Sequence, residues 1–111
     1  MKKQFYTYIQ NLQDTITSKL EELDGGATFV EDLWKRPEGG GGRTRVISEG
    51  NVFEKGGVNI SEVEGELPQV LRDNLEVKEG HFFACGLSLV LHPKNPMVPT
   101  VHANWRYFEM Y

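Results

Sequence analysis

The chain has 111 residues, with 12 lysines and arginines against 16 aspartates and glutamates, and a formal net charge of −4 at pH 7. This length suits one small domain with a modest core, so we expect a single domain over residues 1–111. The acidic balance and the lack of a basic tract argue against a nucleic-acid partner. No apolar run approaches the roughly 20 residues of a membrane span, and the N-terminus lacks a signal-peptide core. We therefore expect a cytoplasmic protein with no transmembrane segment.

The first predicted element is an amphipathic helix over residues 3–23. Its apolar residues recur at spacings of three and four, and Gly25-Gly26 then ends it. The apolar residues are Phe5, Ile9, Leu12, Ile16, Leu20 and Leu23.

The rest of the chain predicts strands with one short helix. An irregular strand over Thr28–Pro37 precedes the glycine run Gly39–Gly42, which we interpret as a turn, with an anion cradle as the alternative. A hairpin follows, with a bulge or close approach expected at Gly56-Gly57 and an acidic, exposed segment after it. The remaining elements are a short helix opened by Pro68 and the strands Phe82–Leu91 and Val98–Met110. The predicted fold class is α+β, an antiparallel β-meander covered by helices on one side or both.

Cys85 is the only cysteine, which excludes an internal disulfide and fits a reducing compartment. It lies between Phe82-Phe83-Ala84 and Gly86-Leu87. We therefore interpret it as a buried, inert thiol.

The last two strands carry the pattern that points to a site. Side chains alternate between the two faces of a strand, so the last strand places reactive polar groups on one face and apolar groups on the other. One face takes Thr100, His102, Asn104 and Arg106, and the other takes Val101, Ala103, Trp105 and Tyr107. In the preceding strand, Ser88 and His92 likewise share a face opposite to Leu87, Leu89 and Leu91.

A hairpin centred near Met97 would bring these polar groups together. It would place His92 opposite His102, Val90 opposite Asn104 and Ser88 opposite Arg106. Histidine transfers protons near neutral pH, and arginine binds carboxylates with two hydrogen bonds. A structural role stays open for each group.

Those structural roles are specific. His102 can be a hydrogen-bonded sheet residue, and Arg106 can pair with Glu109 or Glu54. His92 and His102 can also ligate a divalent metal, although two imidazoles do not define such a site. Arg43 and Arg45 share a face and offer a second place to hold an acidic ligand.

Several longer motifs resemble the oxygen-dependent coproporphyrinogen III oxidase family, in the same order along the chain. The resemblance covers essentially the whole chain and is most specific in the last two motifs. The motifs are Trp34-Lys35-Arg36 with Glu38–Val46, Val52–Asn59, Leu91–Pro96 and Pro99–Glu109.

The resemblance implies an activity in haem biosynthesis. Members of this family convert two propionates of coproporphyrinogen III to vinyl groups, giving protoporphyrinogen IX, carbon dioxide and hydrogen peroxide, with molecular oxygen as co-substrate. It also implies a large flat antiparallel sheet covered by helices and a homodimer. The alternative is a non-enzymatic module that binds a tetrapyrrole or another polycarboxylate.

The resemblance also implies roles for individual residues. His102 matches the proton donor, Ser88 a substrate-binding serine, and Asn104, Trp105 and Arg106 the substrate-binding segment. His92 and His102 match two histidines that bind a divalent metal in bacterial members. The resemblance does not establish that the reaction requires a metal or another cofactor. Family members are roughly three times longer, so we expect residues 1–111 to be the N-terminal part of such a domain, with little activity alone.

Overall fold

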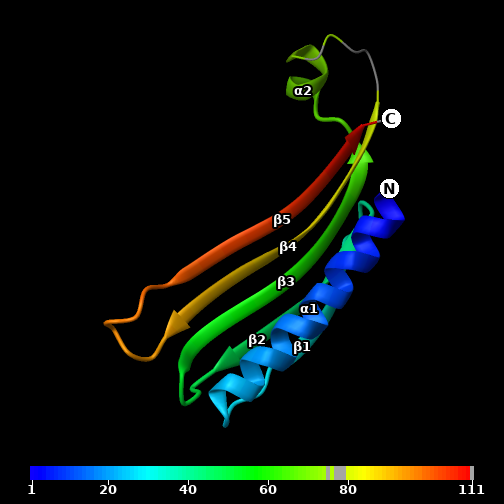
Figure 1. The fold of residues 1–111 in the computed structure, drawn as a ribbon. Helices are drawn as coiled ribbons and strands as arrows, with labels where there is room; N and C mark the ends of the chain where they lie inside the picture. Colours follow the sequence, from blue (N-terminus) through cyan, green and yellow to red (C-terminus); the bar gives the residue numbers. More distant parts are fainter. Residues whose placement is uncertain (75, 77–79, 111) are drawn as a thin grey trace.

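A computed structural model describes residues 1–74, 76 and 80–110. A long helix, α1 (Lys2–Asp24), precedes an antiparallel sheet in the order β1-β2-β3-β4-β5 (Figure 1). A short helix, α2 (Gln69–Asn74), lies beyond one end of the sheet. The strands are β1 (Val30–Lys35), β2 (Gly40–Ser48), β3 (Phe53–Glu66), β4 (His81–Pro93) and β5 (Val101–Met110).

Each strand pairs with its neighbour in sequence, so the predicted meander is confirmed. The predicted helix over residues 3–23 is confirmed as α1, and the short helix after Pro68 as α2. At Gly25 the chain enters the left-handed region with φ of 71°, and its N–H donates to the carbonyl of Glu21. This is the glycine stop that the sequence predicts. Among the described residues, none of the helices is long and apolar enough to cross a membrane.

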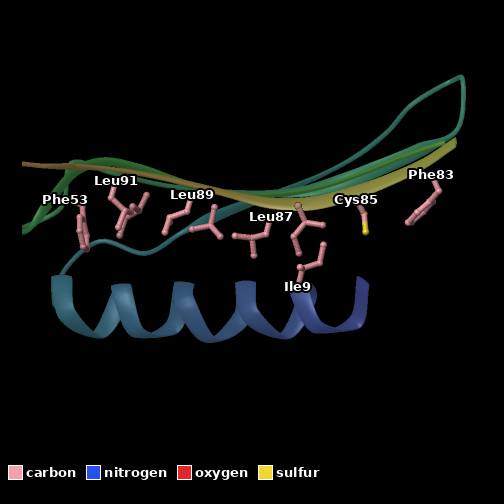
Figure 2. Packing of buried hydrophobic residues seen from close by; sticks show 10 residues of the cluster. Ile9, Phe53, Phe83, Cys85, Leu87, Leu89 and Leu91 are labelled. Carbon is pink, nitrogen blue, oxygen red and sulfur yellow. The ribbon is translucent and has the colours of Figure 1, made fainter. Parts of the chain in front are cut away.

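The core lies between α1 and one face of the sheet (Figure 2). Alternate side chains of β4 extend toward the helix, and Ile9 extends from the helix toward the sheet. Ile9, Val58, Ile60 and Leu87 have no exposed area. The buried β4 side chains are Phe83, Cys85, Leu87, Leu89 and Leu91.

The expected cover of helices is only partly present in the described chain. The helix α1 contacts β3, β4 and β5 on one face of the sheet, whereas α2 makes no comparable contact with any strand. In the part of the chain that the structure describes, no helix lies over the opposite face (Figure 1). We call that opposite side the open face. Its positions on β3, β4 and β5 include Gly57, Ser88 and His102.

Most of the glycine run forms a strand, and only Gly39 lies in the predicted turn. Gly40, Gly41 and Gly42 belong to β2, and the turn lies at Pro37–Gly39. A Cβ atom on Gly42 would lie 2.3 Å from Cζ2 of Trp34. The Trp34 ring therefore covers this glycine from β1, and the anion cradle that we considered is not formed.

The hairpin after β2 also differs from the prediction. β3 continues through the acidic segment to Glu66, and its irregularity lies between Phe53 and Lys55, not at Gly56-Gly57. Gly56 does make the expected close approach, because a Cβ there would lie 2.9 Å from Cδ2 of Leu91. The acidic segment is therefore part of β3, whereas its charge had predicted only an exposed segment after the strand.

Asp24 links the C-terminal end of α1 to the β2–β3 turn by hydrogen bonds. Its carboxylate accepts hydrogen bonds of 3.0 Å from the backbone N–H groups of Ala27, Asn51, Val52 and Phe53. These bonds hold the pKa of the Asp24 carboxyl well below its usual value, the Ala27 bond contributing most. The ionised carboxylate thus satisfies the backbone donors of the turn.

Replacing Leu87 with alanine tests the location of the core. Because Leu87 is fully buried, Leu87→Ala should lower the free energy of unfolding by about 2–5 kcal/mol in urea denaturation. Leu33→Ala is the matched control, since Leu33 is 69% exposed on β1 and should change stability by about 0.5 kcal/mol or less. Equal losses in the two variants would contradict this core.

The Asp24 contacts predict a pH-dependent stability. A carboxyl whose pKa is lowered by folding stabilises the protein above the unfolded pKa of about 3.9, and that contribution disappears as pH falls below it. Asp24→Asn should therefore lower the melting temperature at pH 7, with the difference from wild type shrinking toward pH 2. Asp32→Asn, at an exposed carboxylate, is the control. A difference independent of pH would argue against the ionised form.

Candidate active site

The strand β5 divides its side chains as the sequence predicts. His102, Asn104 and Arg106 are exposed on the open face, whereas Ala103 and Trp105 pack against the core cluster under α1. On β4, Ser88 is half-buried and His92 exposed, both on the open face. The structure therefore brings five residues of the predicted site to one face: Ser88, His92, His102, Asn104 and Arg106.

The predicted pairing of β4 with β5 is wrong by two residues. Ser88 lies opposite Asn104, Val90 opposite His102 and Gly86 opposite Arg106. The connection explains the shift, because Asn95 accepts from the N–H groups of Met97 (2.9 Å, side chain) and Val98 (3.1 Å, carbonyl) and centres the turn earlier. A shift of two preserves the face of every side chain.

Two further residues extend this polar surface, and the sequence reasoning did not assign them to the site. Asn59 on β3 lies opposite Ser88, and Thr44 on β2 lies opposite Asn59, so one polar row crosses β2 to β5. Nε1 of Trp34 donates to Oγ1 of Thr44 at 3.0 Å, and the Thr44 hydroxyl donates to Oδ1 of Asn59. Alternation along the sequence places Thr44 and Asn59 each on one face of its strand. Only the strand pairing shows that this is the face of Ser88.

The polar groups of the site are available to a ligand. Among the described residues, the side chains of Ser88, His102, Asn104 and Arg106 make no hydrogen bond or ion pair with one another or with other side chains. The structural pairing of Arg106 with Glu109 is not formed, because Glu109 lies on the α1 side and accepts from the hydroxyl of Tyr107 at 3.1 Å. Unpaired donors on an exposed surface favour a binding role.

Arg43 and Arg45 lie on the other face and are already paired. Arg45 contacts Asp14 and Glu31 at 2.9 Å each, and Arg43 contacts Asp14 at 3.2 Å and donates to Oε1 of Gln13. These contacts join α1 and β1 to β2. The hypothesis that this pair of arginines holds an acidic ligand is therefore not supported.

Trp105 is the predicted site residue that the structure does not place with the others. Its side chain packs against the core cluster on the α1 side, while its neighbours Asn104 and Arg106 face the open side. From this position only its backbone borders the open face. Trp105 lies between Asn104 and Arg106 in the sequence, and its side chain packs β5 against the core.

His92 and His102 do not by themselves form a divalent-metal site. His102 lies opposite Val90, so the two histidines occupy diagonal positions, and Lys55 lies opposite His92. A lysine beside one imidazole opposes a divalent cation, which favours carboxylate, imidazole or thiolate neighbours. Within the described ranges, no group of three or more such side chains is gathered.

Cys85 is buried, and burial raises the pKa of its thiol, so the predicted inert thiol is supported.

The comparisons with known proteins agree with the motifs. The family described as coproporphyrinogen III oxidase matches residues 4–111 of this chain. Among its relatives is the oxygen-dependent coproporphyrinogen-III oxidase of Parasynechococcus marenigrum, 58% identical over 103 residues, which are 91% of this chain and 28% of the relative. Proteins of the same name from two strains of Prochlorococcus marinus are 55% and 54% identical, over 93% and 97% of this chain.

The chain therefore belongs to the coproporphyrinogen III oxidase family. It spans about a third or less of the length of these relatives, between 28% and 32%.

The division of β5 can be tested with two adjacent substitutions. Trp105→Ala should lower the free energy of unfolding by roughly 2–3 kcal/mol, because it removes a large side chain packed against the core. Asn104→Ala, one residue away on the exposed face, should change it by about 0.5 kcal/mol or less. Urea denaturation of both variants gives the comparison. A stable Trp105→Ala variant would place the indole outside the core.

Proposed function

We propose that this chain supplies a substrate-binding and proton-donating surface for the oxidative decarboxylation of coproporphyrinogen III to protoporphyrinogen IX, with molecular oxygen as co-substrate. The observation that carries the proposal is the row of unpaired polar groups on the open face, His102, Asn104 and Arg106, in a segment that belongs to this family. The names of the relatives support the reaction.

The charge of the open face suits a substrate with several carboxylates. From Lys55 to Gly65 on β3, and throughout β4 and β5, the open-face positions hold no aspartate or glutamate, although the chain as a whole is acidic. The same positions carry Lys55, His92, His102 and Arg106. In this proposal Arg106 binds a propionate with its planar guanidinium, and Ser88 and Asn104 donate hydrogen bonds to it.

The reaction requires a proton in addition to oxygen. Each propionate loses carbon dioxide and one hydrogen with its electron pair, and a vinyl group forms. Oxygen takes up that electron pair and two protons to become hydrogen peroxide. One of those protons comes from the propionate chain and the other from outside. His102, exposed on the open face beside Asn104, is the group that we propose to supply it.

The larger context of the reaction is part of the same proposal. We propose that residues 1–111 act as one part of a longer oxidase domain, in a homodimeric cytoplasmic enzyme. The coverage of the relatives supports the first point. No step is assigned to a metal, because His92 and His102 lack further ligands among the described residues.

A chimera tests the proposed activity. Residues 1–111 would replace the matched segment of the Parasynechococcus relative, with which they share 58% identity. We expect the chimera to form vinyl groups, His102→Ala to lower its kcat at least about 100-fold, and Arg106→Ala to raise its KM about tenfold. Turnover is measured as protoporphyrinogen IX formed from coproporphyrinogen III in air.

The controls separate an enzyme from a passive binding module. Lys3→Ala, at an exposed position of α1, should leave turnover unchanged. His102→Ala should still bind coproporphyrin III, the stable oxidised form of the substrate, with nearly wild-type affinity. Full turnover by His102→Ala would contradict its role as proton donor. Ligand binding by a chimera that never turns over would instead favour the binding module.

A further inference from the structure

The open face has a hollow to which the proposed function assigns no role. It has a volume of about 300 Å³, and it lies toward the end of the sheet where β2 turns into β3. Its open-face side chains come from three neighbouring strands: Val46 on β2, Lys55 on β3, and Val90 and His92 on β4. Gly57 lies in the middle of this set, paired with Val46 on one side and Val90 on the other.

The hollow exists because Gly57 has no side chain. A Cβ atom built there would meet nothing within 4 Å, so the missing side chain leaves open space above the strand. Two other glycines on this face behave differently. Gly42 is covered by the ring of Trp34, and a Cβ on Gly86 would lie 2.8 Å from the backbone oxygen of Trp105. Close packing explains Gly42 and Gly86, but it does not explain Gly57.

The hollow combines apolar side walls with a rim that carries one lysine and one imidazole. Val46 and Val90 flank the empty position, and Lys55 and His92 lie opposite each other at its edge. His102 pairs with Val90 and so lies one strand beyond the hollow, on the same face. A flat apolar group that carries a carboxylate fits such a site, because the valines bury the group while the lysine pairs with the charge.

The spacing of the cations matches a wide ligand. Lys55 lies beside His92 and Arg106 beside Gly86, so the two cations are separated by six residues along β4, or about 20 Å at the usual rise of a strand. Both side chains are long and can reach inward. Carboxylates at opposite edges of one macrocycle can contact both cations, whereas a small dicarboxylate cannot.

We propose that the Gly57 hollow holds one pyrrole ring of the tetrapyrrole substrate, with its methyl group between Val46 and Val90 and its propionate paired with Lys55. The inference rests on the proposed function and extends it, because it adds a second anchoring point away from Arg106. Gly57 then sets the space available to the ring, and Lys55 sets the position of one carboxylate relative to His102.

Binding of coproporphyrin III to the 111-residue chain tests the proposal, with quenching of porphyrin fluorescence as the readout. Lys55→Gln should weaken binding about tenfold and leave binding of the uncharged tetramethyl ester unchanged. Gly57→Val should weaken binding of both ligands about tenfold or more, and Gly57→Ala should have a smaller effect. Valine suits an exposed strand position, so the folded state should persist and thermal unfolding can check it.

Two matched controls keep the test specific. Lys35→Gln removes one positive charge from an exposed position on β1, and Ala84→Val adds the same kind of bulk on the open face of β4, away from the hollow. Neither should change the affinity by more than about twofold. If Lys35→Gln weakens binding as much as Lys55→Gln, the effect is general charge and the proposal is overturned.

The remaining outcomes separate the hollow from the reaction. Unchanged affinity in Lys55→Gln or in Gly57→Val overturns the seating of ring and carboxylate, even if the chimera remains active. Absence of ligand binding by the wild-type chain, with an active chimera, also overturns it. A chimera without turnover counts instead against the proposed function. Loss of affinity in both variants, with both controls unchanged, supports the hollow.

Discussion

The packing of α1 against only one face of the sheet is the constraint on which the rest of this structure depends. A strand alternates its side chains, so a helix on one face forces that face to be apolar or internally paired. The β4 residues Phe83, Leu87 and Leu91 meet this requirement by burial. The opposite face is then released from the requirement to form a core and can carry polar side chains with no internal partner.

Polar groups buried on the helix side have internal partners, whereas the polar side chains of β5 on the open face do not. On the helix side, Gln13 donates to the carbonyls of Arg43 and Val58, and Asp24 accepts four backbone hydrogen bonds. These buried groups are satisfied because an unpaired polar group inside a protein costs free energy. On the open face, Asn104 and Arg106 have no such partners among the described residues. Their bonding capacity remains for a ligand, and that difference is the structural support for the proposed site.

The arrangement also supports the proposal that this surface binds a flat substrate. Polar and cationic groups lie along three adjacent strands, at spacings fixed by the pleat and by the distance between strands. Gly57 leaves a hollow in this surface because it has no side chain. Lys55 and Arg106 lie at opposite ends of the row of polar and cationic groups. A rigid sheet therefore presents anchoring points over a distance that loops would hold less precisely.

The sequence alone determined the elements and the faces, because periodicity is a local property of the chain. The spacing of apolar residues gave α1, and alternation in Val98–Met110 separated His102, Asn104 and Arg106 from Trp105. The motifs also identified the family. The tertiary structure decided the strand register, which depends on where the Asn95 turn closes and moved every predicted pair by two residues. It also decided that Arg43 and Arg45 pair with α1 and β1, and that Gly57 opens a hollow while Gly42 is covered. These outcomes depend on which residues lie across a strand pair or a layer, and no local pattern specifies that.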